Sequence, residues 1–251
     1  MTKKPVWTET FEVKTSETDF QRQWKPSGFF RTMQEIGTHH SIHLGYDYHQ
    51  MNAQGMAFLL SRLKIRFDRF PGPGEQIVLE TWPKGMQQKI FFMRDFQFRT
   101  PDGQPVASAT SAWLLVDIHA RRFLLPDRLK EKLPDNNGRF ALNESLEKIS
   151  LPDQMGERLI AGAAYSTVDM MGHVNNAQYI DWVTDSFPFE TFQENKLDWL
   201  QINYLQEVKP GERVSIAAGS CPEDGSSRVV QGSNLTTGAR AFEACLGWSP
   251  R

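Results

Sequence analysis

The chain has 251 residues, of which 39% are hydrophobic and 23% charged, and its net charge is -2 at pH 7. This length suits one large domain or two small ones, and the near-neutral charge argues against a nucleic-acid-binding protein. With two cysteines and no apolar run of about 18 residues, the sequence predicts neither a disulfide framework nor a stable membrane insertion. We expect a soluble cytoplasmic protein.

The first half opens with an extended segment at 11–15, then a turn and a helix. Apolar residues at three- and four-residue steps from Phe29 to Leu44 predict this helix, which ends at Gly45. Strands follow. Their signals are the alternation at 63–67 and the segments 88–99 and 105–117, which flank a Pro-Asp-Gly turn.

The second half repeats this layout. An extended segment at 163–167 precedes a helix that runs from Tyr179 to Phe187 and ends at Pro188. Weaker strand signals cover 228–234 and 239–248.

Three pairs of anchors recur in the same order, which favours tandem duplication over chance. They are Asp19 with Phe29 and Asp169 with Tyr179, Pro73-Gly74-Glu75 and Pro210-Gly211-Glu212, and Gly103 with Trp113 and Gly238 with Trp248.

Each copy therefore reads as a helix followed by an antiparallel sheet that must cover it, which is an α+β unit. A central helix wrapped by a curved sheet is the hotdog arrangement, so two copies predict a double hotdog. We expect an N-terminal unit at 1–133, a polar linker at 134–158 and a C-terminal unit at 159–251.

The turn before the second helix holds the densest set of reactive side chains: Asp169, His173, Asn175 and Asn176. Either asparagine is suited to cap the helix, whose free N–H groups would polarise a carbonyl oxygen as an oxyanion hole does. His173 exchanges a proton near neutral pH, and Asp169 could orient that imidazole or a water. Taken by itself, such a spacing more often builds only a turn with a surface histidine.

The alignment of the two copies favours a catalytic role for this turn over a purely structural one. His173 aligns with Gln23, and Glu207 aligns with Phe70. The second copy thus places an imidazole and a carboxylate where the first has an amide and an aromatic ring. This asymmetry suggests one copy for catalysis and one for holding an apolar ligand.

The second-copy motif resembles that of the acyl-acyl carrier protein (ACP) thioesterases of plant plastids and bacteria, which runs Asp-Met-Asn-x-His-Val-Asn-Asn-x-x-Tyr-x-x-Trp. Residues 169–182 follow it closely, and Glu207, three residues after Tyr204, matches the family's catalytic glutamate. The stretches 59–83 and 107–126 resemble the family's first half. The resemblance covers nearly the whole chain.

The resemblance implies hydrolysis of the thioester between a fatty acyl chain and the carrier's phosphopantetheine arm, with Asp169, His173 and Glu207 as catalytic positions. In one assignment Glu207 is the general base for water and His173 the proton donor; an Asp169 or Glu207 nucleophile that forms an anhydride is the other route. The first copy would hold the acyl chain. Its candidate lining residues, each also explicable by core packing, are Phe29, Met33, Phe58 and Trp82.

One position departs from the family motif, because its asparagine between Asp169 and His173 is Met171 here. A thioether donates no hydrogen bond. Either a backbone N–H or Asn175 replaces that amide, or activity is reduced.

The resemblance makes acyl-ACP the expected partner, and a basic surface is expected to meet the acidic carrier. We expect no cofactor and no metal: His39 and His43 lack a partnering carboxylate motif, and Cys221 and Cys245 read as structural thiols. An acyl-CoA thioesterase, a non-catalytic acyl-binding module and a homodimer are the alternatives left open. The candidate basic residues are Arg62, Lys64, Arg66, Arg69, Arg121, Arg122, Arg128, Lys130 and Lys132.

Overall fold

The structure is a computed structural model that describes residues 3–129, 132–134, 136 and 138–251. The chain divides into two compact units, Met1–Lys25 with Arg31–Leu146 and Pro26–Phe30 with Glu147–Arg251. Lys130 and Asn137, which the sequence analysis placed in a basic group and in the linker, lie outside the described residues. No helix in the described part of the chain is long and apolar enough to cross a membrane.

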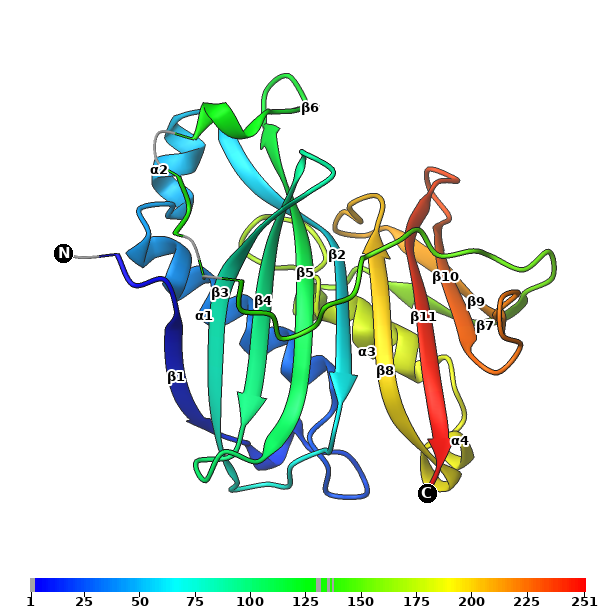
Figure 1. Cartoon of the computed structure of the whole chain (residues 1–251). Coiled ribbons are helices and arrows are strands. Elements are labelled where there is room, and N and C mark those ends of the chain that lie inside the picture. The colour runs from blue at the N-terminus through cyan, green and yellow to red at the C-terminus, as the bar shows by residue number, and fades with distance from the viewer. Residues whose placement is uncertain (1–2, 130–131, 135, 137) are drawn as a thin grey trace. The chain divides into compact units, whose positions relative to one another are not determined.

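The first unit is an antiparallel sheet in the order β1-β3-β4-β5-β2, with β6 on β5, and helix α1 lies against one face of it (Figure 1). Its elements are β1 (Trp7–Glu12), η1 (Thr15–Glu17), α1 (Pro26–His43), α2 (Tyr48–Ala53), β2 (Met56–Phe67), β3 (Gln76–Gln87), β4 (Phe91–Arg99), β5 (Pro105–Asp117), β6 (Arg122–Phe123) and η2 (Pro126–Arg128). The first residues of α1, Pro26–Phe30, group with the second unit.

The second unit repeats this topology in the order β7-β9-β10-β11-β8, again antiparallel throughout. Its elements are β7 (Gly156–Gly162), η3 (Tyr165–Thr167), α3 (Gln178–Asp185), α4 (Phe189–Glu194), β8 (Asn195–Tyr204), β9 (Arg213–Ser220), β10 (Arg228–Asn234) and β11 (Arg240–Pro250). The equivalent strand order in both units confirms the predicted α+β architecture and the duplication.

Two local predictions were wrong. The segments expected to be extended, 11–15 and 163–167, run past the ends of β1 and β7 into the 3-10 turns η1 and η3. The second helix was predicted to run to Phe187 and end at Pro188, but α3 ends at Asp185. Pro188 is instead the N-cap of α4, with the extended ψ of 158° that this position requires. Proline fixes φ near the helical value, so it suits the start of a helix as well as the end of one.

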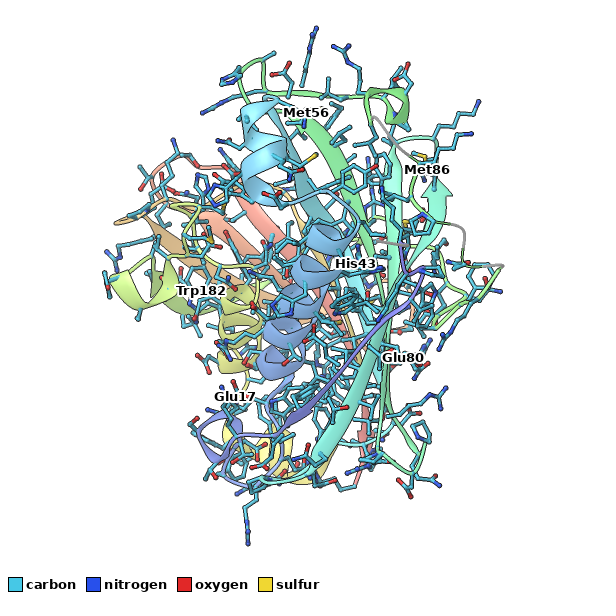
Figure 2. All side chains as sticks on the ribbon, turned by 90° about the vertical axis from the view of Figure 1, so that its left-hand side faces the viewer. Glu17, His43, Met56, Glu80, Met86 and Trp182 are labelled. Carbon is cyan, nitrogen blue, oxygen red and sulfur yellow. The ribbon has the colours of Figure 1, made fainter. Side chains whose placement is uncertain are left out.

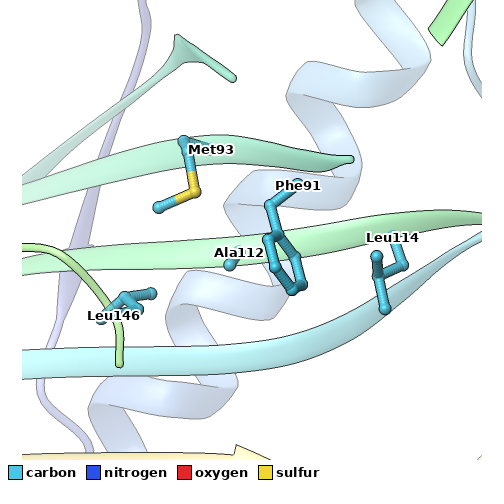
Figure 3. Packing of buried hydrophobic residues seen from close by; sticks show 5 residues of the cluster. All are labelled: Phe91, Met93, Ala112, Leu114 and Leu146. Carbon is cyan, nitrogen blue, oxygen red and sulfur yellow. The ribbon is translucent and has the colours of Figure 1, made fainter. Parts of the chain in front are cut away.

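The stretch predicted as a polar linker packs along its length, and the division between the two units falls within it, at Leu146 and Glu147. We call residues 139–155 the strap. Leu146 is 1% exposed and packs with Phe91, Met93 and Leu114 on the sheet face opposite α1 (Figure 3). Later in the strap, Ile149, Leu151 and Met155 pack against a cluster within the second unit formed by Cys221, Val229 and Cys245. Periodicity could not reveal this, because the strap is held by isolated apolar residues and backbone carbonyls.

The strap also neutralises the basic row expected along β2. Lys64 and Arg66 both pair with Glu144, and Arg62 donates to the backbone carbonyl of Leu146. Arg69 pairs with Glu75 at 2.7 Å. The row is therefore not a free basic surface.

Replacing Leu146 by alanine tests whether the strap stabilises the first unit. A buried leucine truncated to alanine costs about 2–5 kcal/mol of unfolding free energy. We expect Leu146→Ala to lower the urea midpoint accordingly, whereas Ser145→Ala, at an exposed neighbouring position, leaves it nearly unchanged. Equal midpoints for the two variants would show that the strap contributes no packing.

Candidate active site

The turn that carries Asp169 and His173 is closed by its own backbone. Asp169 N–H donates to His173 O at 2.9 Å, and Gly172 N–H donates to Asp169 O at 3.0 Å. Gly172 has φ of +78°, a left-handed conformation that glycine adopts without strain. The turn therefore fixes the backbone at His173.

A second loop meets this turn through one backbone hydrogen bond. Val174 N–H donates to Val208 O at 2.9 Å. Val208 directly follows Glu207 and is fully buried, so it anchors a loop whose flanking residues are exposed. The bond brings the residue after His173 against the residue after Glu207.

The two candidate catalytic side chains meet at this junction. His173 Nε2 lies 3.2 Å from Glu207 Oε2, and the side chains are 32% and 54% exposed. Within the described residues the imidazole lies within ion-pair distance of Glu207, and Asp169 is directed elsewhere. Both groups are open to water and to a substrate carbonyl.

Asp169 instead organises the turn. Its Oδ1 accepts from Met171 N–H at 2.9 Å, and its Oδ2 accepts from Asn175 Nδ2 at 3.4 Å. The two donors considered as replacements for the family's asparagine are thus both present, and both are directed to Asp169. The Met171 side chain is 45% exposed.

The prediction that Asn175 or Asn176 caps the helix was wrong, because the N-cap of α3 is Ala177 and no side chain caps the helix. Asn175 Oδ1 instead accepts from Ala177 N–H at 2.9 Å, within the turn that leads into α3. Asn176 offers its backbone carbonyl to the Tyr204 hydroxyl at 3.0 Å, and its side-chain amide makes no hydrogen bond within the described residues. That amide is free to donate to a substrate oxygen.

Sequence reasoning gave no supporting role to Tyr179 or Tyr204. Their rings pack edge to face at 5.6 Å, and burial raises the pKa of both hydroxyls, which therefore stay protonated. Val208 N–H bonds the Tyr179 hydroxyl, and Tyr204 fixes Asn176. The signal was the position of each tyrosine, one three residues after Asn176 and one three residues before Glu207.

Glu212 holds the loop from its far end. Its Oε2 accepts from Lys209 N–H at 2.8 Å and from Asn234 Nδ2 at 2.7 Å. The hydrogen bond from Lys209, followed by that from Asn234, keeps the pKa of Glu212 below its usual range. The carboxylate thus stabilises the loop that presents Glu207.

The first unit builds the same framework without the reactive pair. Asp19 N–H donates to Gln23 O at 2.8 Å, and Trp24 N–H donates to Pro71 O at 2.8 Å. By this pairing Gln23 corresponds to His173 and Phe70 to Glu207, as the alignment of the copies predicts. The scaffold is therefore duplicated, whereas the acid–base pair belongs to the second unit.

The residues predicted to line an acyl slot are spread over different faces. Met33 is buried in α1, and Phe58 packs against Phe92 on the side of the first sheet where α2 lies. Trp82 points the other way, because its Nε1 donates to Arg139 O of the strap at 2.9 Å. Phe29 is buried in the stretch Pro26–Phe30, which groups with the second unit.

Comparison with known families identifies the chain. The model of the acyl-ACP thioesterase N-terminal domain matches residues 4–129, and that of the C-terminal domain matches residues 157–248. The chain belongs to the acyl-ACP thioesterase family.

Curated relatives agree with this membership. An oleoyl-ACP thioesterase from Coriandrum sativum is 24% identical over 90% of this chain and 66% of its own length. A palmitoyl-ACP thioesterase from Gossypium hirsutum is 22% identical over 80% of this chain and 52% of its own length. This thioesterase-family chain thus spans about half to two thirds of the length of these relatives.

Solved structures share the fold. An acyl-ACP thioesterase from Bacteroides thetaiotaomicron superposes with a TM-score of 0.80 at 21% identity, covering 98% of each chain. A 12:0-ACP thioesterase from Umbellularia californica gives a TM-score of 0.82 at 21% identity, covering 99% of this chain and 98% of its own. At this identity the likeness shows the fold, and it confirms the predicted double hotdog.

Acid titration tests the loop contact of Glu212. Its folded pKa is lowered, so its stabilising contribution is fully present above the ordinary glutamate pKa of about 4.3 and is lost as pH falls through the lowered value. We expect Glu212→Gln to lower the melting temperature at pH 7 by a few degrees, with the gap to wild type closing at acid pH. A gap that is constant from pH 7 to 3 would contradict an ionised carboxylate in this role.

Proposed function

We propose that this chain hydrolyses fatty acyl-ACP to a free fatty acid and ACP, with the reaction at His173 and Glu207. The 3.2 Å contact between these two partly exposed side chains is the observation that carries the proposal. Membership of the acyl-ACP thioesterase family supports the substrate class. A cytoplasmic location remains a prediction from the sequence composition.

The geometry favours a direct attack by water. Glu207, the more exposed of the pair, removes a proton from a water that attacks the thioester carbon. The carbonyl oxygen becomes an oxyanion, toward which the Asn176 amide donates. The C–S bond then breaks as His173 gives its proton to the leaving sulfur. The proton on Glu207 passes to His173 across their contact, which restores the pair.

The covalent route through Asp169 fits the geometry less well. Both oxygens of Asp169 already accept hydrogen bonds, from Met171 N–H and from Asn175. A carboxylate held in this way is a weakened nucleophile, because either attacking oxygen would give up the hydrogen bond that it accepts. We therefore assign Asp169 to positioning of the turn.

We keep the first unit as the holder of the acyl chain, with Met33 and Phe58 as its candidate contacts. Met33, in α1, and Phe58, in β2, lie on the face of the first sheet opposite the one that the strap covers. Trp82 is left out because it packs on the strap. The asymmetry of the copies, with Phe70 in place of the catalytic carboxylate, supports this division of labour.

The docking surface for an acidic carrier is reduced to few candidates. Lys64, Arg66 and Arg69 are paired with acidic side chains. Arg122 also lies 3.9 Å from the carboxylate of Asp117. Arg121 and Arg128 are exposed, form no ion pair within the described residues, and remain the better candidates to meet ACP.

Single substitutions test the catalytic pair. Loss of a positioned acid or base costs about 10²–10⁴-fold in rate. We expect His173→Ala and Glu207→Gln each to lower kcat on lauroyl-ACP by this amount, with KM changed little, as measured by thiol release.

The duplication supplies the matched control. Gln23→Ala alters the equivalent turn position of the first unit, where no acid–base pair exists, so kcat is expected to stay within about twofold of wild type. Wild-type rates for both second-unit variants would show that the reaction occurs elsewhere.

Carrier choice separates the proposal from its alternatives. We expect kcat/KM for lauroyl-ACP to exceed that for lauroyl-CoA by about tenfold or more, because only ACP offers a protein surface to bind. A preference for the CoA ester would favour an acyl-CoA thioesterase. Tight binding of lauroyl-ACP without thiol release would establish a non-catalytic acyl-binding module.

A further inference from the structure

The loop that carries Glu207 has a counterpart in the first unit, and each loop ends at an anchoring glutamate. Glu75 and Glu212 both accept a hydrogen bond from the backbone N–H group three residues earlier. Each glutamate directly precedes a strand, Glu75 before β3 and Glu212 before β9. Figure 2 shows β3 running from its start past the labelled Glu80 to Met86. The two loops can therefore be compared residue by residue.

The start of each loop is also held in the same way. In each unit two consecutive backbone N–H groups share one carbonyl oxygen of a facing strand: residues 68 and 69 share that of residue 106 in β5, and residues 205 and 206 share that of residue 241 in β11. Arg69 therefore corresponds to Gln206, the residue directly before Glu207.

The two anchoring glutamates differ in the side chain that binds them. Arg69 Nη2 lies 2.7 Å from Glu75 Oε2, so a guanidinium neutralises the first anchor. Asn234 Nδ2 donates to Glu212 Oε2 at 2.7 Å, so a neutral amide holds the second. Gln206 carries no charge, and no cation in the described part of the chain forms an ion pair with Glu212. The second unit therefore keeps the anchor and lacks the arginine that accompanies it in the first.

The Asn234 side chain is buried, and hydrogen bonds orient both ends of its amide. The residue is 1% exposed, and its Oδ1 accepts from Thr236 N–H at 2.9 Å and from Thr237 N–H at 3.3 Å. These two bonds fix the amide so that Nδ2 faces Glu212. The turn between β10 and β11 thereby holds the far end of the Glu207 loop without a charged group.

Glu212 lies within electrostatic reach of the catalytic pair. Hydrogen bonds from Lys209 N–H and from Asn234, together with attraction by the His173 imidazole, lower the pKa of Glu212. The carboxylate is therefore ionised at neutral pH. A guanidinium that paired with it would cancel this negative charge near His173.

An arginine at position 206 would act against both members of the pair. A guanidinium binds carboxylates through two parallel N–H donors, and Glu207 is the adjacent residue. A carboxylate beside a positive charge is a weaker base, and an imidazole beside one is harder to protonate. In the first unit Phe70 occupies the position of Glu207, so the same arginine opposes no reaction there.

We propose that Asn234 is a positioning residue for the hydrolysis reaction, which holds the Glu207 loop through Glu212, and that this amide takes the place of an arginine so that no cation lies beside the catalytic pair. The proposal rests on the function proposed above. Asn234 acts through Glu212 and does not contact the substrate. Position 206 contributes only by carrying no positive charge.

Gln206→Arg tests the need for a neutral side chain, because it introduces the ion pair of the first unit into the second. An exposed pair of this kind changes stability little, so the melting temperature is expected to stay within a few degrees of wild type. A neighbouring charge changes the proton affinity of an acid or base by about tenfold or more, so kcat on lauroyl-ACP is expected to fall by that factor, with KM not raised. Gln206→Met is the neutral control, and its kcat is expected to stay within about twofold of wild type.

Exchanging donor and acceptor at the second anchor tests Asn234 itself. Asn234→Asp keeps the acceptor for Thr236 and Thr237 but sets a second carboxylate against Glu212, so kcat is expected to fall about tenfold. Adding Glu212→Gln reverses the bond, because the new amide donates to the new carboxylate while its oxygen still accepts from Lys209 N–H. We expect the double variant to recover kcat to within about threefold of wild type. Rates are measured well below the melting temperature of each variant, so kcat reports the loop and not global unfolding.

Four results would overturn the proposal. Wild-type kcat in Gln206→Arg would show that a cation beside Glu207 does not disturb the pair, and an equal loss in Gln206→Met would show that charge is not the cause. Wild-type kcat in Asn234→Asp, or no recovery in the double variant, would show that the amide does not position the loop. These results leave hydrolysis itself untouched, whereas absence of thiol release by wild type would overturn the proposed function and this proposal with it.

Discussion

The hydrogen bond from Val174 N–H to Val208 O is the constraint on which the candidate active site depends. It joins a turn before α3 to a loop after β8, segments that are distant in the sequence. Each of its ends directly follows a candidate catalytic residue. A side-chain contact between two partly exposed groups has little stability of its own. The backbone bond, with its buried valines, supplies the order that the side chains lack.

Duplication explains how such a site arises on an existing framework. The Trp24–Pro71 bond of the first unit shows that the junction forms without an imidazole or a carboxylate. The glutamates Glu75 and Glu212 each accept a backbone N–H from their own loop, so the loop anchor is shared as well. Replacement of Gln23 and Phe70 by their counterparts His173 and Glu207 is what distinguishes the second unit. The first unit lacks the acid–base pair and has an aromatic interior that also contains the buried Arg94.

The sequence predicted the parts of the structure that follow from periodicity and repetition. Alternation and helical spacing located α1 and the long strands, and the aligned Pro-Gly-Glu anchors placed Glu207 opposite Phe70. The sequence analysis also predicted that His173 and Glu207 lie at one site, which agrees with their 3.2 Å contact. The sequence did not determine which carboxylate lies next to the His173 imidazole. Asp169 is four residues before His173, but this spacing cannot show that its carboxylate accepts from Met171 N–H and leaves Glu207 beside the imidazole.

Long-range packing lies outside what such patterns reveal. The strap reads as polar and turn-rich, yet Leu146 is buried by a sheet whose residues lie far away in the sequence. The sequence also does not show that Asp95 pairs with Lys84 on one face of β4 while Arg94 bonds His40 and Thr81 on the other. Both features are set by which face of a strand each side chain occupies after the sheet has formed.

A double-mutant cycle on His173 and Glu207 tests most directly whether the two residues work as one unit. The kcat of His173→Ala, Glu207→Gln and the double variant would be measured on the same acyl-ACP. Residues that act together are strongly non-additive, so the double variant is predicted to be no slower than the slower single variant within about threefold. Losses that multiply would mean that the two side chains act independently and would contradict the account.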